Sequence, residues 1–269
     1  MTDSGARMID KVARSLRKRT GRLLGAPVKP EELLRRKTIA GAYLRGQGIE
    51  IGALHNPLKV PKTARVRYVD RLSVTDLRKE NPELDGKKLV NVDILDDGTT
   101  LSTLQDATQD FVIANHVVEH CEDPIRALRN MLRVLKVGGV LYLAIPDKRY
   151  TFDKDRPVTP LAHLMRDYQE GPAWSRRQHF EEWTRLVDKI QDDERAAHEA
   201  EELMVRRAAI HFHVWTQGEL LELIVSLQRM WPFDVEMMFK RDNEVIFVLR
   251  KNAAHPTAVA PVDPVPADA

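Results

Sequence analysis

The stretch Gly48–Pro57, taken with Tyr68–Asp70, limits the fold of this chain more than any other feature. An apolar run reaches Glu50 and breaks at Gly52, and 18 residues later a second apolar run ends at the carboxylate of Asp70. A glycine lets the backbone approach a ligand closely, and a carboxylate at the tip of the next strand can accept two ribose hydroxyls. The pattern is typical of an α/β sheet that binds an adenosine-containing cofactor.

Short apolar runs bounded by turn residues predict strands along the first half of the chain. We expect five of them, at residues 48–53, 66–70, 89–93, 111–115 and 140–145. Helices are predicted in the intervals, at 73–79, at 100–104 if only as a turn, and at 124–135. The last of these has Asp123 as its cap and should close at Gly138-Gly139. This alternation implies a parallel sheet covered on both faces.

The alternation stops after Pro146. Residues 147–212 are rich in charge, His and Trp, and they predict a mostly helical insertion. Its helices are expected at 159–168 and 176–207. The sheet should then resume with an amphipathic helix at 216–228 and two strands at 233–239 and 244–250.

Three further segments, 89–94, 110–120 and 132–146, follow the opening motif in a recognisable order. With them, residues 48–146 resemble the class I methyltransferases that use S-adenosyl-L-methionine, in particular those with an Asn-His-x-x-Glu-His segment before Asp-Pro. The resemblance implies a Rossmann-like α/β fold with a seven-stranded, mostly parallel sheet, helices on both faces, an antiparallel last strand and a helical insertion after strand five. It also implies S-adenosyl-L-methionine as the cofactor.

The resemblance also implies which residues bind that cofactor. Gly52 would line its methionine portion, and Glu50 would order the loop. Asp70 would accept the ribose hydroxyls. Asp93 would accept from the adenine amino group, with Ile94 packed on the ring. The full expected set is Glu50, Gly52, Ala53, His55, Asp70, Asp93, Ile94 and Asn115.

The first loop departs from the Gly-x-Gly-x-Gly pattern of the family, because only Gly52 remains and residues 53–57 are bulkier. Two interpretations follow. The loop could reshape the pocket of an active enzyme, or the chain could be a non-catalytic binding protein with a degenerate methyltransferase fold. The other motifs are complete, which favours the enzyme.

Three residues are candidates for the removal of a proton from the methyl acceptor: His116, His213 and Asp147. His116 directly follows the tip of the fourth strand. His211 and His213 alternate on an extended segment, where two satisfied core histidines are an equally good interpretation. No metal is expected, because the spacing of His116 and His120 lacks the His-Glu-x-x-His order.

The acceptor is expected to be a polar small molecule, such as a sugar or glycan precursor, methylated on oxygen. This expectation depends on the polar rim that follows strand five, at residues 147–150. The insertion 147–212 is expected to act as a mobile lid that supplies the acceptor pocket.

Positive charge is concentrated at the start of the chain. Residues 1–37 carry a net charge of +7 in a chain of net charge +2. The predicted organisation is a basic helical arm at 1–40, a methyltransferase domain at 41–251 and a disordered tail at 252–269. The arm could lie on an anionic membrane surface or pack over the catalytic domain, and its lack of aromatic residues argues against nucleic acid.

The remaining features of composition are ordinary. At 269 residues the chain can bury one full core. It shows neither an apolar run long enough to cross a bilayer nor the layout of a signal peptide, so a cytoplasmic location is expected. The single cysteine, Cys121, excludes an intramolecular disulfide.

Overall fold

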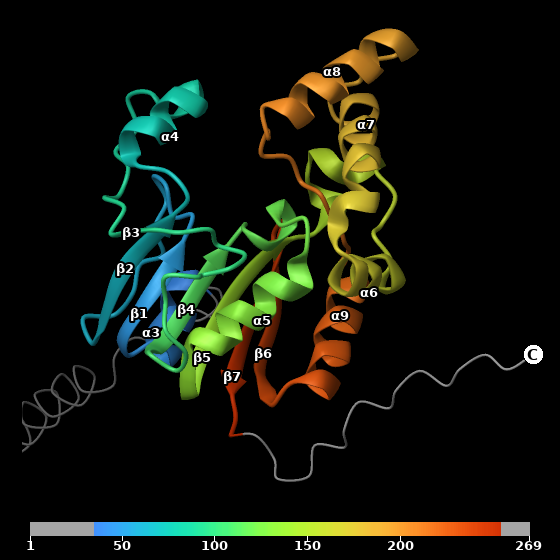
Figure 1. The fold of residues 1–269 in the computed structure, drawn as a ribbon. Helices are drawn as coiled ribbons and strands as arrows, with labels where there is room; N and C mark the ends of the chain where they lie inside the picture. The colour runs from blue at the N-terminus through green and yellow to red at the C-terminus, as the bar shows by residue number, and fades with distance from the viewer. Residues whose placement is uncertain (1–34, 254–269) are drawn as a thin grey trace, which may run out of the picture.

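The computed structural model describes residues 35–253, which fold around a seven-stranded sheet (Figure 1). Its strands are β1 (Gly46–Ile51), β2 (Ala64–Asp70), β3 (Ile94–Leu95), β4 (Gln109–Asn115), β5 (Leu135–Pro146), β6 (Phe233–Arg241) and β7 (Glu244–Lys251). They lie in the order β3-β2-β1-β4-β5-β7-β6, and β7 runs antiparallel to both neighbours. This confirms the expected fold class. Of the predicted arm and tail, residues 1–34 and 254–269 lie outside the described part.

The prediction of strand three at 89–93 is wrong. β3 comprises only Ile94–Leu95, which pair with Val69 and Asp70 of β2. The preceding segment instead lies against the loop after β1, where the N–H of Val90 donates to the carbonyl of Leu54. Apolar side chains of this segment line a pocket beside β2. The apolar run therefore reflects packing against β2 and not pairing within the sheet.

The described α-helices are α3 (Arg36–Tyr43), α4 (Val74–Glu80), α5 (Pro124–Val134), α6 (Leu161–Glu170), α7 (Arg176–Leu186), α8 (Asp193–Val205) and α9 (Gln217–Met230). Asp123 caps α5 as predicted, because its side chain accepts from the N–H of Arg126. Thr216 and Glu219 form a capping box at the start of α9.

The expected closure of α5 at Gly138-Gly139 is wrong. The helix ends at Val134, and both glycines lie within β5. The pairing of β5 with β4 shifts in register between Gln109 and Phe111, so extra residues of β5 bulge out there. Gly138 has a φ of +80°, which suits this irregularity.

The predicted helix 176–207 is two helices, α7 and α8, separated by residues 187–192. Lys189 has a positive φ inside the break, and Asp192 caps α8. The two helices share a small core with the segment that follows them, made by Phe180, Ala200, Leu203, Ile210 and Phe212.

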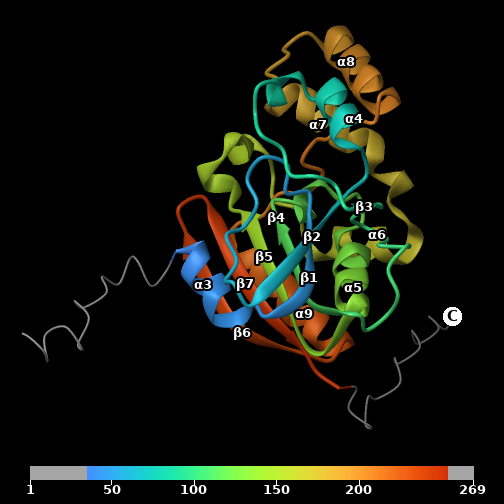
Figure 2. The same ribbon diagram turned by 90° about the vertical axis from the view of Figure 1, so that its left-hand side faces the viewer.

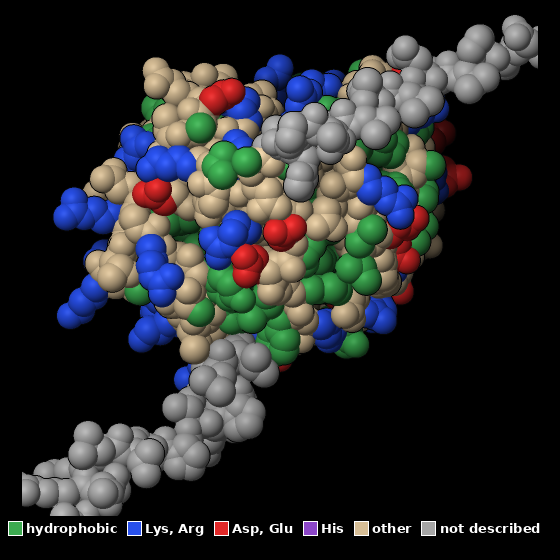
Figure 3. All heavy atoms as spheres, turned by 90° about the horizontal axis from the view of Figure 1, so that it is seen from below, with side chains coloured by type: hydrophobic (Ala, Val, Ile, Leu, Met, Phe, Trp, Pro, Cys, Tyr) green, Lys and Arg blue, Asp and Glu red, His purple; other side chains and the backbone are tan. Residues whose placement is uncertain are grey.

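Two cores cover the two faces of the sheet. Helices α5, α6 and α9 pack on one face, and α3 packs on the other (Figure 2). The carboxyl ends of the parallel strands lie at the top in Figure 1, where α4 and the pair α7–α8 rise at opposite sides. The opposite end, seen from below, presents hydrophobic and charged side chains intermixed (Figure 3). None of the described helices is long and apolar enough to cross a membrane.

Candidate functional site

Glu50 lies one residue before the end of β1, and its side chain is buried. Its two carboxylate oxygens accept from the N–H of Leu58 at 2.9 and 3.1 Å, and Oε1 also accepts from Nδ2 of Asn115 at 3.3 Å. These bonds fold the loop after β1 back over the strand end. Burial raises the pKa of the Glu50 carboxyl to about 7, against the effect of the hydrogen bonds.

Gly52 occupies the point of this loop where the backbone needs a glycine. Its φ is +62°, and its N–H donates to the carbonyl of Val69 on β2. Ala53 is buried beside it, whereas His55 is exposed. The one glycine that the loop retains therefore makes a backbone hydrogen bond to β2.

Asp70 ends β2 beside a narrow, mainly apolar pocket. The pocket is lined by Ala53, Leu54, Tyr68, Val69, Asp70, Leu77, Leu89, Val90 and Val92. Asp70 is half-buried, and burial raises the pKa of its carboxyl despite a backbone hydrogen bond from Leu72 at 3.4 Å. An apolar surface next to a carboxylate is the combination that binds a purine and a ribose, but this pocket is closed and would have to open before a purine could enter.

Asp93 and Ile94 lie at the edge of β2. Oδ2 of Asp93 accepts from the N–H of Tyr68 at 2.8 Å. Ile94 pairs with Val69 and packs against the larger core. One oxygen of Asp93 is thus already bound to the backbone, which leaves the other for a ligand.

A polar atom at the end of β4 has no partner within the described part of the chain. Oδ1 of Asn115 is buried and has no hydrogen-bond partner among the described residues. The next residue, His116, has a φ of +53°, an uncommon conformation for a residue with a side chain. Such features are frequent at functional sites.

His116 lies among charged groups. Nε2 is 3.0 Å from Oε2 of Glu244 and 3.0 Å from Nη2 of Arg36, and Nδ1 is 3.5 Å from Oε1 of Glu119. Burial alone would lower the pKa of His116, but the two carboxylates outweigh burial and raise it to about 9. The imidazole is therefore cationic at neutral pH.

Arg36 and Glu244 are site residues that the sequence did not reveal. They form an ion pair with each other. Burial would raise the pKa of Glu244, but His116 and Arg36 lower it to about 2. Glu244 starts β7 opposite Pro146 of β5, so the sheet register brings it to the carboxyl edge. Arg36 and Glu244 are 208 residues apart in the sequence, so no local sequence pattern could predict that they meet.

Glu119 is fully buried. Neither of its carboxylate oxygens has a hydrogen-bond partner among the described residues, since the contact to His116 lies at the outer limit of such a bond. Two other imidazoles lie nearby. His120 pairs through Nδ1 with the carbonyl of Ile210, and His211 pairs through Nδ1 with Asp153. Glu119, His120 and His211 place ligand atoms within 4.8 Å of one another.

The three residues expected to remove a proton have three different sets of partners. Asp147 is buried, and Arg149 donates to both of its oxygens, so the pKa of its carboxyl is lowered despite burial. His213 is buried and has Nε2 at 3.1 Å from the carbonyl of Glu122. Of the three, only His116 has a side chain that is partly exposed at the carboxyl edge.

Part of the chain matches a known protein family. Residues 51–143 match the model of a family described as a methyltransferase domain. No curated protein matches the chain. Among solved structures, the chain is similar to a protein assigned as an S-adenosyl-L-methionine-dependent methyltransferase from Methanococcus maripaludis, with 15% identity, 94% of each chain covered and a TM-score of 0.42.

Two further structures are similar at the same level. One is a SAM-dependent methyltransferase from Aquifex aeolicus, with 13% identity, 82% of this chain and 88% of that chain covered, and a TM-score of 0.42. The other is a protein assigned as a zinc-dependent alcohol dehydrogenase from Rhodobacter sphaeroides, with 16% identity, 87% and 94% covered, and a TM-score of 0.48.

The family match runs from the last residue of β1 into the second half of β5. The strand order is that of the class I methyltransferases. The chain therefore carries an S-adenosyl-L-methionine-dependent methyltransferase domain, and S-adenosyl-L-methionine is its cofactor.

The residues at the carboxyl edge fit this cofactor. Asp70 and the apolar side chains beside it would contact adenosine once the closed pocket opens, and the backbone at Gly52 would approach the methionine portion. The unpaired oxygens of Asn115 and Glu119 suit donors such as an ammonium or hydroxyl group.

Proposed function

We propose that the chain transfers the methyl group of S-adenosyl-L-methionine to an oxygen of a polar small molecule, such as a sugar or glycan precursor. In this proposal Glu50, Gly52, Ala53, His55, Asp70, Asp93, Ile94 and Asn115 bind the cofactor, and the acceptor lies above the end of β4. Methyl transfer from a sulfonium is an in-line displacement, so alignment of the two reacting atoms supplies most of the rate.

The observation that carries the proposal is the unsatisfied carboxylate of Glu119. The contact from His116 lies at the outer limit of a hydrogen bond, so a ligand hydroxyl that reaches this buried carboxylate when the site opens would supply a closer donor. His116 adds a cation 3.5 Å away, and Arg36 adds a second charge at the same edge. These charged groups favour a polyhydroxylated or anionic acceptor over an apolar one.

The acceptor hydroxyl must lose its proton as the methyl group arrives. We propose that the pair His116–Glu119 accepts it, with His116 as the base. All three candidates have partners at their polar atoms, and both nitrogens of His116 lie near carboxylates. His116 is preferred because its side chain is partly exposed, whereas Asp147 and His213 are buried.

The pH dependence of the rate tests this assignment. A base must be deprotonated, so with a His116 pKa of about 9 the turnover number should rise as pH increases from 7 and should level off above 9. His116→Gln should remove that rise and lower turnover by about 10²-fold or more. A rate that is flat from pH 7 to 10 in the wild-type protein would leave His116 with an ion-pair role only.

Identification of the acceptor begins with a radioactive transfer assay. The protein, labelled S-adenosyl-L-methionine and fractionated small molecules from cell extract are incubated, and the labelled product is analysed by mass spectrometry. Transfer to a hydroxyl of a saccharide supports the proposal. Transfer only to nitrogen, carbon or an apolar acceptor contradicts it.

A further inference from the structure

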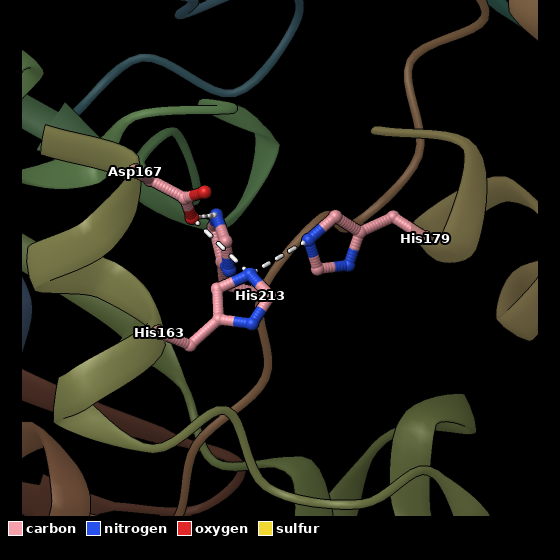
Figure 4. Close-up of side chains that lie close together, drawn as sticks. All are labelled: His163, Asp167, His179 and His213. Carbon is pink, nitrogen blue, oxygen red and sulfur yellow. Dashed lines mark hydrogen bonds and ion pairs between the residues drawn. The ribbon is translucent and has the colours of Figure 1, made fainter. Parts of the chain in front are cut away.

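We propose that His163, Asp167, His179 and His213 form a structural zinc site, which we call the insertion cluster. It joins the insertion to the segment that returns to the sheet, and it is separate from the proposed methyl-transfer site at the end of β4. Figure 4 shows the four side chains gathered together. Each places a ligand atom within 4.8 Å of those of the other three.

The spacing of the polar atoms suits tetrahedral coordination. Nε2 of His163 is 3.2 Å from Nε2 of His179 and 3.2 Å from Oδ2 of Asp167. The ring of His213 approaches the same oxygen, with Nε2 at 3.6 Å. Four ligands at the usual zinc distances of about 2.0–2.2 Å lie about 3.3 Å apart along the edges of a tetrahedron. The two separations around Nε2 of His163 are close to that value.

The charge of Asp167 needs a cation that the described side chains do not supply. The residue has no exposed surface, and Oδ2 has no hydrogen-bond partner among the described residues. No described Lys or Arg forms an ion pair with it, and the ionisable groups in contact with it are the imidazoles of His163 and His213. Burial in this position without a counter-charge is strongly unfavourable.

The three imidazoles lie close together. His179 and His213 are buried, with ring centroids 4.9 Å apart. The ring of His163 lies 5.0 Å from that of His179 and 5.5 Å from that of His213. A metal binds such rings through the lone pairs of their neutral form. The group around Glu119 differs, because it has only two imidazoles and lies next to His116.

Surrounding groups orient the proposed ligands. The hydroxyl of Ser175 donates to Oδ1 of Asp167 at 3.0 Å, which leaves Oδ2 for the imidazoles. The ring of His213 stacks on Trp215 and has Nε2 at 3.1 Å from the carbonyl of Glu122. Its Nδ1 is buried with no hydrogen-bond partner among the described residues, so Nδ1 is the nitrogen of this ring that is left for a metal, whereas the contact to Asp167 is made by Nε2. Hydrogen bonds of this type to carboxylate and imidazole ligands are usual around bound metals.

The arrangement favours a structural site over a catalytic one. Four protein ligands close a tetrahedron and leave no open position. Three imidazoles and one carboxylate suit zinc better than magnesium or calcium, which prefer oxygen ligands. His163 and Asp167 lie on one face of α6, His179 lies on α7, and His213 lies on the segment that returns to the sheet. Zinc would join these three parts of the chain.

Metal content and thermal stability of the full chain test the inference, with any purification tag removed. We expect about one zinc ion per chain by mass spectrometry. A chelator should lower the melting temperature, zinc should restore it, and magnesium should not. Cobalt(II) added to the stripped protein should show the strong visible absorption of four-coordinate cobalt.

His179→Gln and Asp167→Asn should each weaken zinc binding at least about tenfold. His198→Gln is the matched control, because His198 lies exposed on α8 beside Glu202. A wild-type chain that holds little zinc and whose melting temperature does not respond to zinc would overturn the proposal, whether or not the variants fold. Equal zinc content in wild type and both ligand variants would also overturn it.

Discussion

Asp70 carries a half-buried carboxylate at the tip of β2, next to the apolar pocket. We predict that Asp70→Ala weakens S-adenosyl-L-methionine binding at least about tenfold, because each lost hydrogen bond to a charged group costs about 1.5–3 kcal/mol. The melting temperature should change little, since the side chain belongs to neither core cluster. Isothermal titration calorimetry measures the effect.

The control is Asp234→Ala, which removes an exposed carboxylate on β6. Its affinity for the cofactor should equal that of the wild type. An unchanged dissociation constant for Asp70→Ala would mean that the ribose is held elsewhere. No cofactor binding by the folded wild-type protein would instead favour the non-catalytic binding protein.

Glu50 makes stability depend on pH in an unusual direction. Its pKa is about 7 in the folded state against 4.5 for the ordinary group, so the folded state holds the proton more tightly. Stability should therefore fall as pH rises from about 4.5 to 7, by an amount on the order of 3 kcal/mol, and remain constant above that range. Urea titrations at several pH values measure it.

Glu50→Gln cannot titrate and should lack this decline. Its amide oxygen can still accept from the N–H of Leu58, so the loop should keep its fold. Glu222→Gln, an exposed position on α9, should keep the wild-type profile. Parallel profiles for Glu50→Gln and the wild type would show that Glu50 has an ordinary pKa.

At the scale of elements, α3 does more than cover the sheet. Ile39 and Ala40 bury one side of the helix against the smaller core, while Arg36 at its first turn reaches Glu244 and His116. The short helix thus links the start of the described chain to the site. The predicted arm at 1–40 overlaps this packed helix at residues 36–40.

Arg36→Gln should lower the free energy of unfolding by about 1–3 kcal/mol near pH 6, since it leaves Glu244 short of a charged partner. The pKa of Glu244 should rise from about 2 toward its ordinary value, which NMR titration can follow. Lys37→Gln, at the exposed neighbouring position, is the control and should change neither quantity. Identical effects of both variants would indicate loss of general charge only.

The insertion is held together by its own contacts. α7 and α8 have their own small core, and Arg156 is buried in ion pairs with Asp153 and Glu182. Arg156 also donates to the carbonyls of His211 and Phe212. The expected lid role stays a prediction, and these contacts favour a lid that moves as one body.

For the whole molecule, the concentration of basic residues at 1–37 leaves the rest of the chain acidic. Deletion of residues 1–34 should reduce association with vesicles that contain anionic lipid, and the reduction should fade as salt increases. Cofactor binding should be unaffected, because α3 and Arg36 remain. Vesicle sedimentation at low and high salt measures the association, with neutral vesicles as the control.

Equal sedimentation of the full and shortened chains at low salt would exclude peripheral membrane contact through the arm. Loss of cofactor affinity on the same deletion would show that the arm packs over the catalytic domain. The expected cytoplasmic location stays a proposal that fractionation of cells would test.

Several elements of the fold can be predicted from local signals in the sequence. Apolar runs placed β1, β2 and β4 within two residues of their observed bounds, and Asp123 marked the start of α5. Gly52 can be recognised because a positive φ favours glycine at that position, and Asp70 can be recognised because it ends an apolar run. Hydrophobic periodicity, capping and positive φ all act over a few residues, so they can be read along the chain.

Features that depend on residues remote in the sequence became apparent only in the tertiary structure. β3 is two residues long because β2 pairs there, and the glycines of β5 form a bulge because β4 sets the register. Arg36 meets Glu244, and the insertion cluster assembles from two helices and a returning segment. Long-range packing and burial set these contacts and the pKa values that follow from them, and no single stretch of sequence contains that information.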